Sequence, residues 1–339
     1  MCSNTPADLE EIDLVIVGAG PAGLFATFCA GLRDIGSITL EAMDAPGGQL
    51  YKLYPEKYVY DVQGIPKIRA MELVTHMTQQ ARMFGSEIRT NSSVTDIIPR
   101  NDQRYDVEVN GKTAYTARTI LLATGIGSFT PVRIGVPGEE EYTEKGVTYR
   151  VGDPEYFRGK RVLIVGAGDS AFDWTEEISS VARNVIIAQR GTRIRAAERM
   201  VKNVMERDNV DIMLNTMVTR ITGNGSWIEE ALVTNTETGE DARIPVDHIL
   251  VAIGHKSDPV IFKTLKPDMT GRFIRIDRSF ETSLKGIYAV GDAANLDSDQ
   301  KVLLIAVGGA EAYMAINNIK RYLEPKASLF GGHSSSLKH

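Results

Sequence analysis

Three glycines near the start of the chain have the spacing of a phosphate-binding turn. Gly18, Gly20 and Gly23 follow an apolar run at residues 14–17 and precede apolar residues at helical spacing. The first glycine permits a tight turn, the second lets the backbone approach a pyrophosphate, and the third lets the helix pack on the strand. The helix N-terminus then presents N–H groups to the anion. The alternative is a glycine-rich turn in an ordinary α/β domain.

An acidic residue follows the next predicted strand. Residues 37–40 are expected to form this strand, and Glu41 comes directly after it. A carboxylate about 20 residues beyond such a turn can accept hydrogen bonds from ribose hydroxyls. Strand, glycines, helix and acid together favour a dinucleotide site over an ordinary turn.

The same pattern occurs again further along the chain. Gly166, Gly168 and Ala171 follow an apolar run at residues 162–165. Because one such unit holds one pyrophosphate, two copies predict two nucleotide-binding domains. A degenerate second copy that binds nothing is the alternative.

The second copy differs where its second strand ends. No acid stands there, and Arg190 and Arg195 follow instead. Guanidinium groups can bind a 2′-phosphate in bidentate fashion, whereas a carboxylate would repel it. We therefore expect NADP rather than NAD in this domain. A solvated basic face is the competing interpretation, because basic residues continue as far as Arg207.

Other predicted strands also end on glycine. Gly125 and Gly254 close two apolar runs, and a third run ends at Gly291 and Asp292. The Asp292 carboxylate can accept a hydrogen bond from a sugar-alcohol hydroxyl. Residues 301–322 predict a long helix whose N-terminus would stabilise negative charge on a ligand.

The remaining pattern completes a mixed α/β chain. Residues 70–84 predict an amphipathic helix. Three short strands with an Asn-Gly hairpin turn are expected at 94–98, 105–109 and 113–117. The fold class is α/β, with two Rossmann-like domains that have parallel sheets and a three-stranded antiparallel element.

A loop at residues 45–58 is rich in glycine and tyrosine. Its rings include Tyr51, Tyr54 and Tyr58, with Tyr60 close behind. They could simply fill a long loop, or they could offer a flat surface to a flat ligand.

Composition excludes several classes of protein. The chain has 339 residues, which suits two domains, and a net charge of −6, which gives no indication of nucleic acid or anionic membrane as partner. No apolar run is long enough to span a membrane, so a cytoplasmic protein is expected. The two cysteines, Cys2 and Cys29, form no CxxC motif, and the histidines lack zinc-site spacing, so no metal site is expected.

On these residues the chain resembles the two-dinucleotide-binding flavoprotein family, and within it the low-molecular-weight thioredoxin reductases. The matching motifs are residues 18–23, 47–50, 123–125, 166–171 and 291–292. The resemblance implies FAD on the first turn and NADPH on the second. It also implies a discontinuous FAD domain, with residues 1–124 and 253–339 flanking an NADPH domain at 125–252.

One departure bears on the activity. Thioredoxin reductases carry a CxxC just before the second glycine turn, but residues 146–153 here contain no thiol. Dithiol exchange needs a thiolate, so that chemistry is excluded. The loop at 49–61 and the tail at 333–336 are similar to the thioredoxin-reductase-type ferredoxin–NADP(+) reductases. That resemblance implies hydride transfer from NADPH to flavin N5, followed by two one-electron transfers to ferredoxin.

The resemblance also implies roles for individual residues. The ring of Tyr54 would stack on the flavin, and His333 from the partner subunit of a homodimer would cover the opposite face. Ser334 and Ser335 would lie near N5; composition alone predicts a disordered tail here, with His333 exposed. The implied cofactor-binding residues are Gly18, Gly20, Pro21, Ala22, Gly23, Glu41, Gly48, Gln49, Leu50, Tyr54, Asp61, Val94, Ala123, Thr124, Gly125, Phe129, Gly166, Gly168, Asp169, Ser170, Ala171, Arg190, Arg195, Gly254, Gly291, Asp292, Ser334 and Ser335.

Docking of an acidic ferredoxin calls for local positive charge. The candidates beside the flavin loop are Lys52, Lys57, Lys67 and Arg69, each of which could also be an ordinary surface residue. Three other functions remain open. These are an NADPH-dependent reductase of flavin, quinone or flavodoxin, a disulfide reductase that uses a partner's thiols, and a non-catalytic nucleotide sensor.

Overall fold

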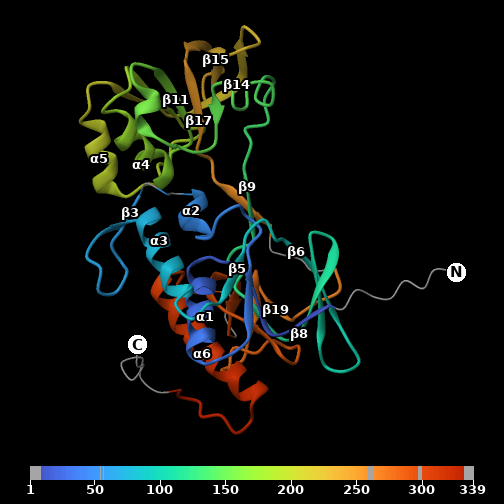
Figure 1. The fold of residues 1–339 in the computed structure, drawn as a ribbon. Coiled ribbons are helices and arrows are strands. Elements are labelled where there is room, and N and C mark those ends of the chain that lie inside the picture. Colours follow the sequence, from blue (N-terminus) through green and yellow to red (C-terminus); the bar gives the residue numbers. More distant parts are fainter. Residues whose placement is uncertain (1–8, 54, 56, 259–262, 297–299, 332–339) are drawn as a thin grey trace, which may run out of the picture. The chain divides into compact units, whose positions relative to one another are not determined.

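The computed structural model describes residues 9–331 except 54, 56, 259–262 and 297–299, and only the backbone of 128–130 and 255–258. The chain forms two compact units. Unit 1 combines Met1–Ser128 with Ser257–His339, and unit 2 is Phe129–Lys256. Within unit 1 the blue-to-teal first part and the orange-to-red last part of the chain lie side by side (Figure 1). The chain passes between the units through β9 (Ser128–Pro131) and β18 (His255–Asp258), which pair with each other.

Unit 1 is built on a seven-stranded sheet. Six of its strands have the order β5-β2-β1-β8-β7-β6, and the seventh, β21, also pairs with β8. The strands are β1 (Glu10–Val17), β2 (Ser37–Leu40), β5 (Glu87–Arg89), β6 (Val94–Pro99), β7 (Tyr105–Val109), β8 (Lys112–Leu122) and β21 (Ile287–Ala289). Strands β5, β2, β1, β8 and β21 run parallel, whereas β6, β7 and β8 form the expected three-stranded antiparallel element.

Helices cover one face of this sheet. The helices of unit 1 are α1 (Pro21–Leu32), α2 (Gln49–Leu53), α3 (Ala70–Ala81) and α6 (Ile305–Leu323), with a short 3-10 turn η2 (Gly291–Ala293). Small strands complete the unit: β3 (Tyr58–Val59), β4 (Ile68–Arg69), β19 (Met269–Thr270), β20 (Phe273–Arg275) and β22 (Ala294–Asn295). Helices α1 and α6 lie side by side in Figure 1.

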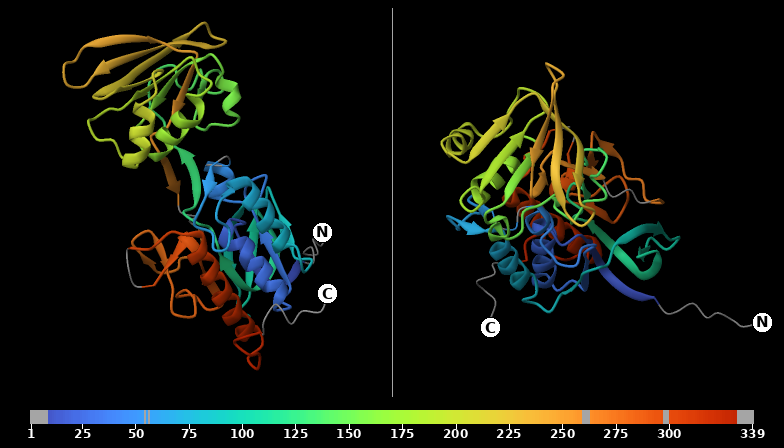
Figure 2. Two further views of the ribbon diagram at one scale, coloured as in Figure 1. Left: turned by 90° about the vertical axis from the view of Figure 1, so that its left-hand side faces the viewer. Right: turned by 90° about the horizontal axis from the view of Figure 1, so that it is seen from above.

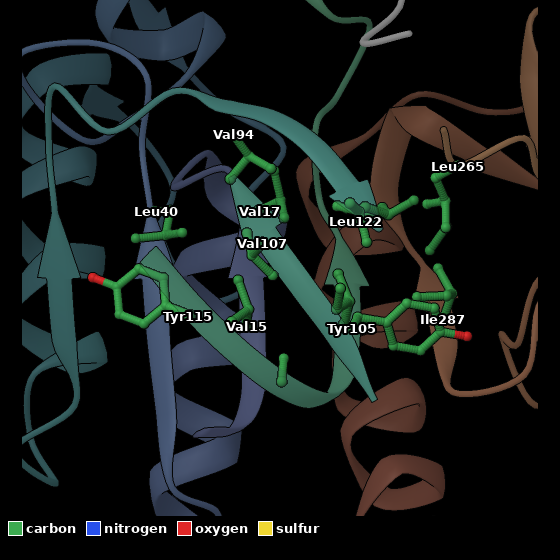
Figure 3. Packing of buried hydrophobic residues seen from close by; sticks show 14 of the residues in the cluster. Val15, Val17, Leu40, Val94, Tyr105, Val107, Tyr115, Leu122, Leu265 and Ile287 are labelled. Atoms are coloured by element: carbon green, nitrogen blue, oxygen red, sulfur yellow. The ribbon is translucent and has the colours of Figure 1, made fainter. Parts of the chain in front are cut away.

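The two faces of β1 explain its unbroken apolar run. Leu14 and Ile16 pack with residues of α1 and α6, whereas Val15 and Val17 belong to a core on the opposite face. That second core joins the parallel strands to β6 and β7, as Figure 3 shows for Val107 and its neighbours. A strand buried on both sides has no polar face, so alternation is absent.

Unit 2 repeats the parallel plan with a five-stranded sheet in the order β10-β17-β11-β12-β13. Its elements are β10 (Val147–Thr148), η1 (Pro154–Phe157), β11 (Arg161–Val165), α4 (Asp169–Ile178), β12 (Asn184–Ala188), α5 (Glu198–Met205), β13 (Val210–Met213) and β17 (His248–Val251). An antiparallel sheet of β14 (Thr216–Gly223), β15 (Ile228–Asn235) and β16 (Asp241–Pro245) shares a core with it and is drawn in yellow and orange in Figure 2.

Two expected elements have different bounds in the structure. The strand predicted at 113–117 and the apolar run that ends before Gly125 are one continuous strand, β8, because its register with β1 runs from Tyr115 to Leu122. The helix predicted to begin at residue 301 begins at Ile305. Leu304 before it has an extended backbone, and the Lys301 side chain is drawn back to the carbonyl oxygen of Gly291.

Among the described residues, we find no helix that combines the length and the apolar character needed to cross a bilayer.

Candidate functional site

The site in unit 1 forms where four parallel strands end together. Val17 is in register with Leu40 and with Leu122, and Leu122 is in register with Ala289. The residues that follow these strands therefore meet at the carboxyl edge of one sheet. This edge is where open α/β sheets bind ligands.

Glycine is required in the turn between β1 and α1. Gly18 has φ +99°, and a Cβ atom there would lie 2.6 Å from the carbonyl oxygen of Ala123. A Cβ atom on Gly23 would lie 1.9 Å from the carbonyl oxygen of Gly18. Both contacts would be clashes with backbone, so the turn could not pack against the end of β8 with larger residues.

Gly20 and Gly48 form a cradle at the start of α1. The Gly47 N–H donates to the Ala19 carbonyl oxygen at 2.8 Å. This bond holds the loop that carries Gly47 and Gly48 against the turn that carries Gly20. A Cβ atom on Gly48 would lie 2.9 Å from the Gly20 Cα. Helix α1 has no side-chain cap at Gly20, so its first N–H groups are available to an anion. The loop that carries Gly48 therefore lies directly against the start of α1, with no room for a side chain at this position.

Glu41 is fixed by two backbone amides. Its carboxylate accepts the Ala19 N–H at 2.7 Å and the Met43 N–H at 2.9 Å, and the residue is 6 % exposed. A carboxylate offers about four acceptor positions, so about two are left for the hydroxyls of a ribose.

The Gly291–Asp292 turn comes from the far end of the chain to the same edge. Gly291 has φ +67°, and a Cβ atom there would lie 3.1 Å from the Ala22 Cβ. The Asp292 carboxylate accepts a hydrogen bond from Gln49 Nε2 at 2.8 Å. The turn thus connects the β1–α1 turn to the loop that carries Gly48.

The structure places the other expected flavin-site residues unevenly. Leu50 is buried in α2, Ala123–Gly125 directly follow β8, and Val94 is the buried first residue of β6. Asp61 is exposed, and Phe129 lies in β9, where only the backbone is described. Four expected residues fall outside the described part of the chain: Tyr54, His333, Ser334 and Ser335.

The corresponding turn in unit 2 also needs glycine for close backbone packing. Gly166 has φ +113°, and a Cβ atom there would lie 2.5 Å from the Ala252 carbonyl oxygen. Gly168 precedes α4, which has no side-chain cap at that position, and a Cβ atom on Gly168 would meet nothing within 4 Å. Ala171, at the position that corresponds to Gly23 in unit 1, is fully buried. The first two residues of α4, Asp169 and Ser170, line the opening.

A cleft of about 1150 Å³ lies over this turn, within unit 2. Arg190, Arg193 and Arg195 line it, together with Gly254. Within the part of the chain that the structure describes, these three arginines make no ion pair. Two hydrogen bonds position their loop. The Arg195 backbone N–H donates to the Ala167 carbonyl oxygen at 2.9 Å, and the Gln189 side-chain Nε2 donates to the Arg193 carbonyl oxygen at 3.0 Å.

Sequence reasoning missed parts of both sites. The cleft is also lined by residues 132–137 and 216–219, which carry no motif and reach it only through the fold. Lys301 and Glu311, which contact the Gly291 turn, were also missed, because neither belongs to a recognised pattern.

The thiol chemistry of the chain is limited. Cys29 is buried in α1, and this burial raises the pKa of its thiol to about 12, so it stays protonated near neutral pH. The segment at residues 146–153, expected to lack a thiol, contains β10 (Val147–Thr148) and no cysteine.

Comparison with known proteins places these features in one family. Residues 12–318 match the family described as pyridine nucleotide-disulphide oxidoreductase. The ferredoxin–NADP reductase of Picrophilus torridus is 48% identical over 332 residues, covering 97% of this chain and 100% of that protein. The enzyme of the same name from Sulfurisphaera tokodaii is 41% identical over 329 residues, covering 97% of this chain and 98% of that one.

The fold is also found among solved structures. The crystal structure of T. acidophilum thioredoxin reductase matches with a TM-score of 0.77 and 27% identity, over 93% of this chain and 99% of that one. The α/β, thioredoxin-reductase-like fold expected from the sequence is therefore confirmed, and the chain belongs to the pyridine nucleotide-disulphide oxidoreductase family.

Proposed function

We propose that this chain is a ferredoxin–NADP reductase that binds FAD in unit 1 and NADPH in unit 2. The observation that carries the proposal is that each unit has a glycine turn and that the strand after the turn's helix is followed by a different residue type in the two units. Glu41 follows the second strand of unit 1, whereas Arg190 follows that of unit 2. Relatives between 40% and 48% identical over 97% of the chain are named for this activity.

The residues of unit 1 supply binding and orientation. FAD, when bound, accepts a hydride from NADPH and passes electrons on singly, which joins two-electron and one-electron carriers. The Gly20–Gly48 cradle admits the pyrophosphate, and the fixed Glu41 carboxylate receives ribose hydroxyls. Asp292, held by Gln49, receives a hydroxyl of the ribityl chain. A place for Tyr54 and His333 on the two faces of the flavin ring is part of the proposal.

The residues of unit 2 select the phosphorylated coenzyme. The uncapped start of α4 and the open space at Gly168 receive the pyrophosphate. Arg190 and Arg195 bind the 2′-phosphate, and Arg193 in the same cleft adds positive charge. Gly191, next to Arg190, has no side chain, and a Cβ atom there would meet nothing within 4 Å.

The proposed acceptor is ferredoxin, for which the relatives are named, rather than a disulfide, because no CxxC motif precedes the second glycine turn. Cys2 and Cys29 are its only cysteines, and Cys29 is buried. Exposed cations lie near the flavin loop: Lys52 on α2, and Lys67, whose Nζ lies 3.9 Å from the centre of the Tyr58 ring. Charge and aromatic surface together suit an acidic ferredoxin. A reductase of flavin, quinone or flavodoxin is the alternative.

The described end of the chain supports a homodimer. Arg33, at the end of α1, donates to the carbonyl oxygen of Ser328 at 2.7 Å, and Gly331 lies against its side chain. The 12-residue helix α1 is about 18 Å long, so this contact is far from the helix start that faces the cofactor. This contact supports the proposal of a homodimer, in which His333 of one copy would cover the flavin of another.

Anaerobic spectroscopy of the purified protein tests the proposal. We expect a yellow protein whose flavin absorbance is bleached by NADPH and restored by oxidised ferredoxin but not by oxidised thioredoxin. A colourless protein after incubation with FAD, or a flavin that excess NADPH leaves oxidised, would contradict the proposal. Equal restoration by quinone and ferredoxin at matched concentrations would favour the alternative reductase. The expected cytoplasmic location stays a prediction, which cell fractionation would check.

A further inference from the structure

A buried ion pair adjoins the Gly291 turn. Lys301 Nζ lies 2.7 Å from the Glu311 carboxylate, and the two side chains are only 6 % and 15 % exposed. Lys301 precedes α6, and Glu311 lies in its second turn. The pair therefore straddles the start of the helix that follows the Gly291–Asp292 turn.

The pair holds the backbone of that turn from both sides. Lys301 Nζ donates to the carbonyl oxygen of Gly291 at 2.7 Å and to that of Ala294 at 2.6 Å. Glu311 Oε2 accepts the Gly291 N–H at 2.7 Å. Together with the ion pair, these bonds use all three donors of the ammonium group. Both polar backbone groups of Gly291 are thus fixed by a single pair of side chains.

The held residue stands where the two helix starts meet. A Cβ atom on Gly308, in the first turn of α6, would lie 3.3 Å from the Ala22 Cβ and 3.6 Å from the Gly291 Cα. Ala22 belongs to the first turn of α1. Displacement of Gly291 would therefore move Asp292 and disturb the contact between the two helix N-termini.

An apolar pair would fill the same space without desolvating two charges, and such replacements are often neutral for stability. An apolar pair could not, however, bind the N–H and C=O groups of a residue in the left-handed region. We propose that Lys301 and Glu311 are positioning residues, which set the Gly291–Asp292 turn in the conformation that receives FAD. This inference rests on the proposed function.

The experiment compares three variants of the full chain: Lys301→Met, Glu311→Gln, and the charge-neutral double variant Lys301→Met with Glu311→Leu. The urea midpoint of unfolding is measured for each apoprotein. Separately, each folded apoprotein is titrated with FAD, with flavin fluorescence as the signal. We expect both single variants to bind FAD about tenfold more weakly or worse, because charged hydrogen bonds are lost. The double variant should have a urea midpoint close to that of the wild type, because no unpaired charge is left buried. It should still bind FAD about tenfold more weakly than the wild type, since no side chain bonds to the backbone of Gly291.

A matched control uses the ion pair at the other end of the same helix. Lys320 Nζ lies 2.8 Å from Glu324 Oε1. Lys320→Met and Glu324→Gln should leave the FAD affinity of the apoprotein unchanged. NADP+ binding to unit 2 should be unchanged in every variant.

The outcomes separate this inference from the proposed function. If the single variants do not fold, the double variant decides. Wild-type affinity for FAD in a folded double variant would overturn the positioning role and leave the proposed function intact. Failure of the wild-type apoprotein to bind FAD would overturn the proposed function, and the inference with it.

Discussion

The Glu41 carboxylate and the Ala19 amide nitrogen lie 2.7 Å apart, which ties the end of β2 to the glycine turn after β1. One buried side chain therefore orders the turn and presents the acid that would meet a ribose. A substitution of Glu41 should therefore affect both the order of the turn and the binding of the cofactor.

Glu41→Gln should weaken unit 1 and its grip on FAD. The amide group of glutamine brings N–H donors towards the Ala19 and Met43 N–H groups, so one of these buried donors loses its acceptor. We expect a loss of about 1–3 kcal/mol in the free energy of unfolding and less flavin per protein. Urea unfolding and the ratio of flavin to protein absorbance measure both. Glu87→Gln, at an exposed carboxylate of β5, is the control and should change neither.

Gly48→Ala should distort the cradle. Its Cβ atom would lie 2.9 Å from the Gly20 Cα at φ +56°, so the loop would have to move away from the start of α1, to which the pyrophosphate is assigned. We expect FAD affinity to fall by about tenfold or more, as measured by titration of the apoprotein. Gly64→Ala controls for backbone strain alone, because Gly64 has φ +83° with nothing within 4 Å of a Cβ atom. Equal effects of the two substitutions would contradict the assignment.

Arg190→Ala and Arg195→Ala should each reduce the preference for NADPH over NADH. Loss of a guanidinium–phosphate contact removes about 1.5–3 kcal/mol, so the ratio of kcat/KM values should fall by about 10- to 100-fold. The change should come from a higher KM for NADPH, with NADH turnover little affected. Arg183→Ala, on an exposed arginine outside the cleft, is the matched control. A preserved ratio in both variants would refute the assigned phosphate site.

The stability of unit 2 should fall in mild acid. His248 is 1 % exposed, and burial, with a smaller effect of the Lys160 charge, lowers its pKa from 6.5 to about 4. Between pH about 6.5 and about 4, His248 is therefore protonated in the unfolded chain but neutral in the folded chain. The stabilisation of the folded state by neutral His248 is complete above pH 6.5 and is lost as the pH falls, by up to about 3 kcal/mol.

Urea unfolding between pH 7.5 and 4 measures this slope, and His248→Gln provides the comparison. The Gln side chain can still bond to Thr148, whose hydroxyl lies 2.9 Å from His248 Nε2, but it cannot titrate. We expect a flatter dependence of unfolding free energy on pH in the variant. Identical slopes would show that other groups cause the acid sensitivity.

Removal of positive charge at Lys52 and Lys67 should slow ferredoxin reduction. Both side chains are exposed, and neither is assigned to cofactor binding. In the variant with Gln at both positions we expect a several-fold lower rate with ferredoxin at low salt and a smaller salt dependence. NADPH-dependent reduction of a small dye should be unchanged. Lys112→Gln, at an exposed lysine of β8, is the control, and equal losses with dye and ferredoxin would argue against docking here.

Local backbone requirements were predictable from the sequence, whereas contacts made by the fold were not. Gly18, Gly23 and Gly166 could be assigned because each lies where a Cβ atom would strike a neighbouring carbonyl group. The start of α6 was predicted too early, because the residue pattern does not show that Lys301 bonds to the Gly291 turn and that Leu304 is extended. The cleft-lining segments of unit 2 are brought together by sheet order, which residue patterns do not encode.

The interruption of unit 1 by unit 2 affects how the protein is made. The sheet edge that would receive FAD needs β1 from the first part of the chain and β21 from the last. A ribosome that adds about 5–20 residues per second takes on the order of ten seconds to synthesise the intervening unit. Unit 2 is continuous in sequence and can fold as soon as it emerges, while β8 still lacks its partner β21. Binding of FAD at this edge would therefore have to wait until β21 has been synthesised.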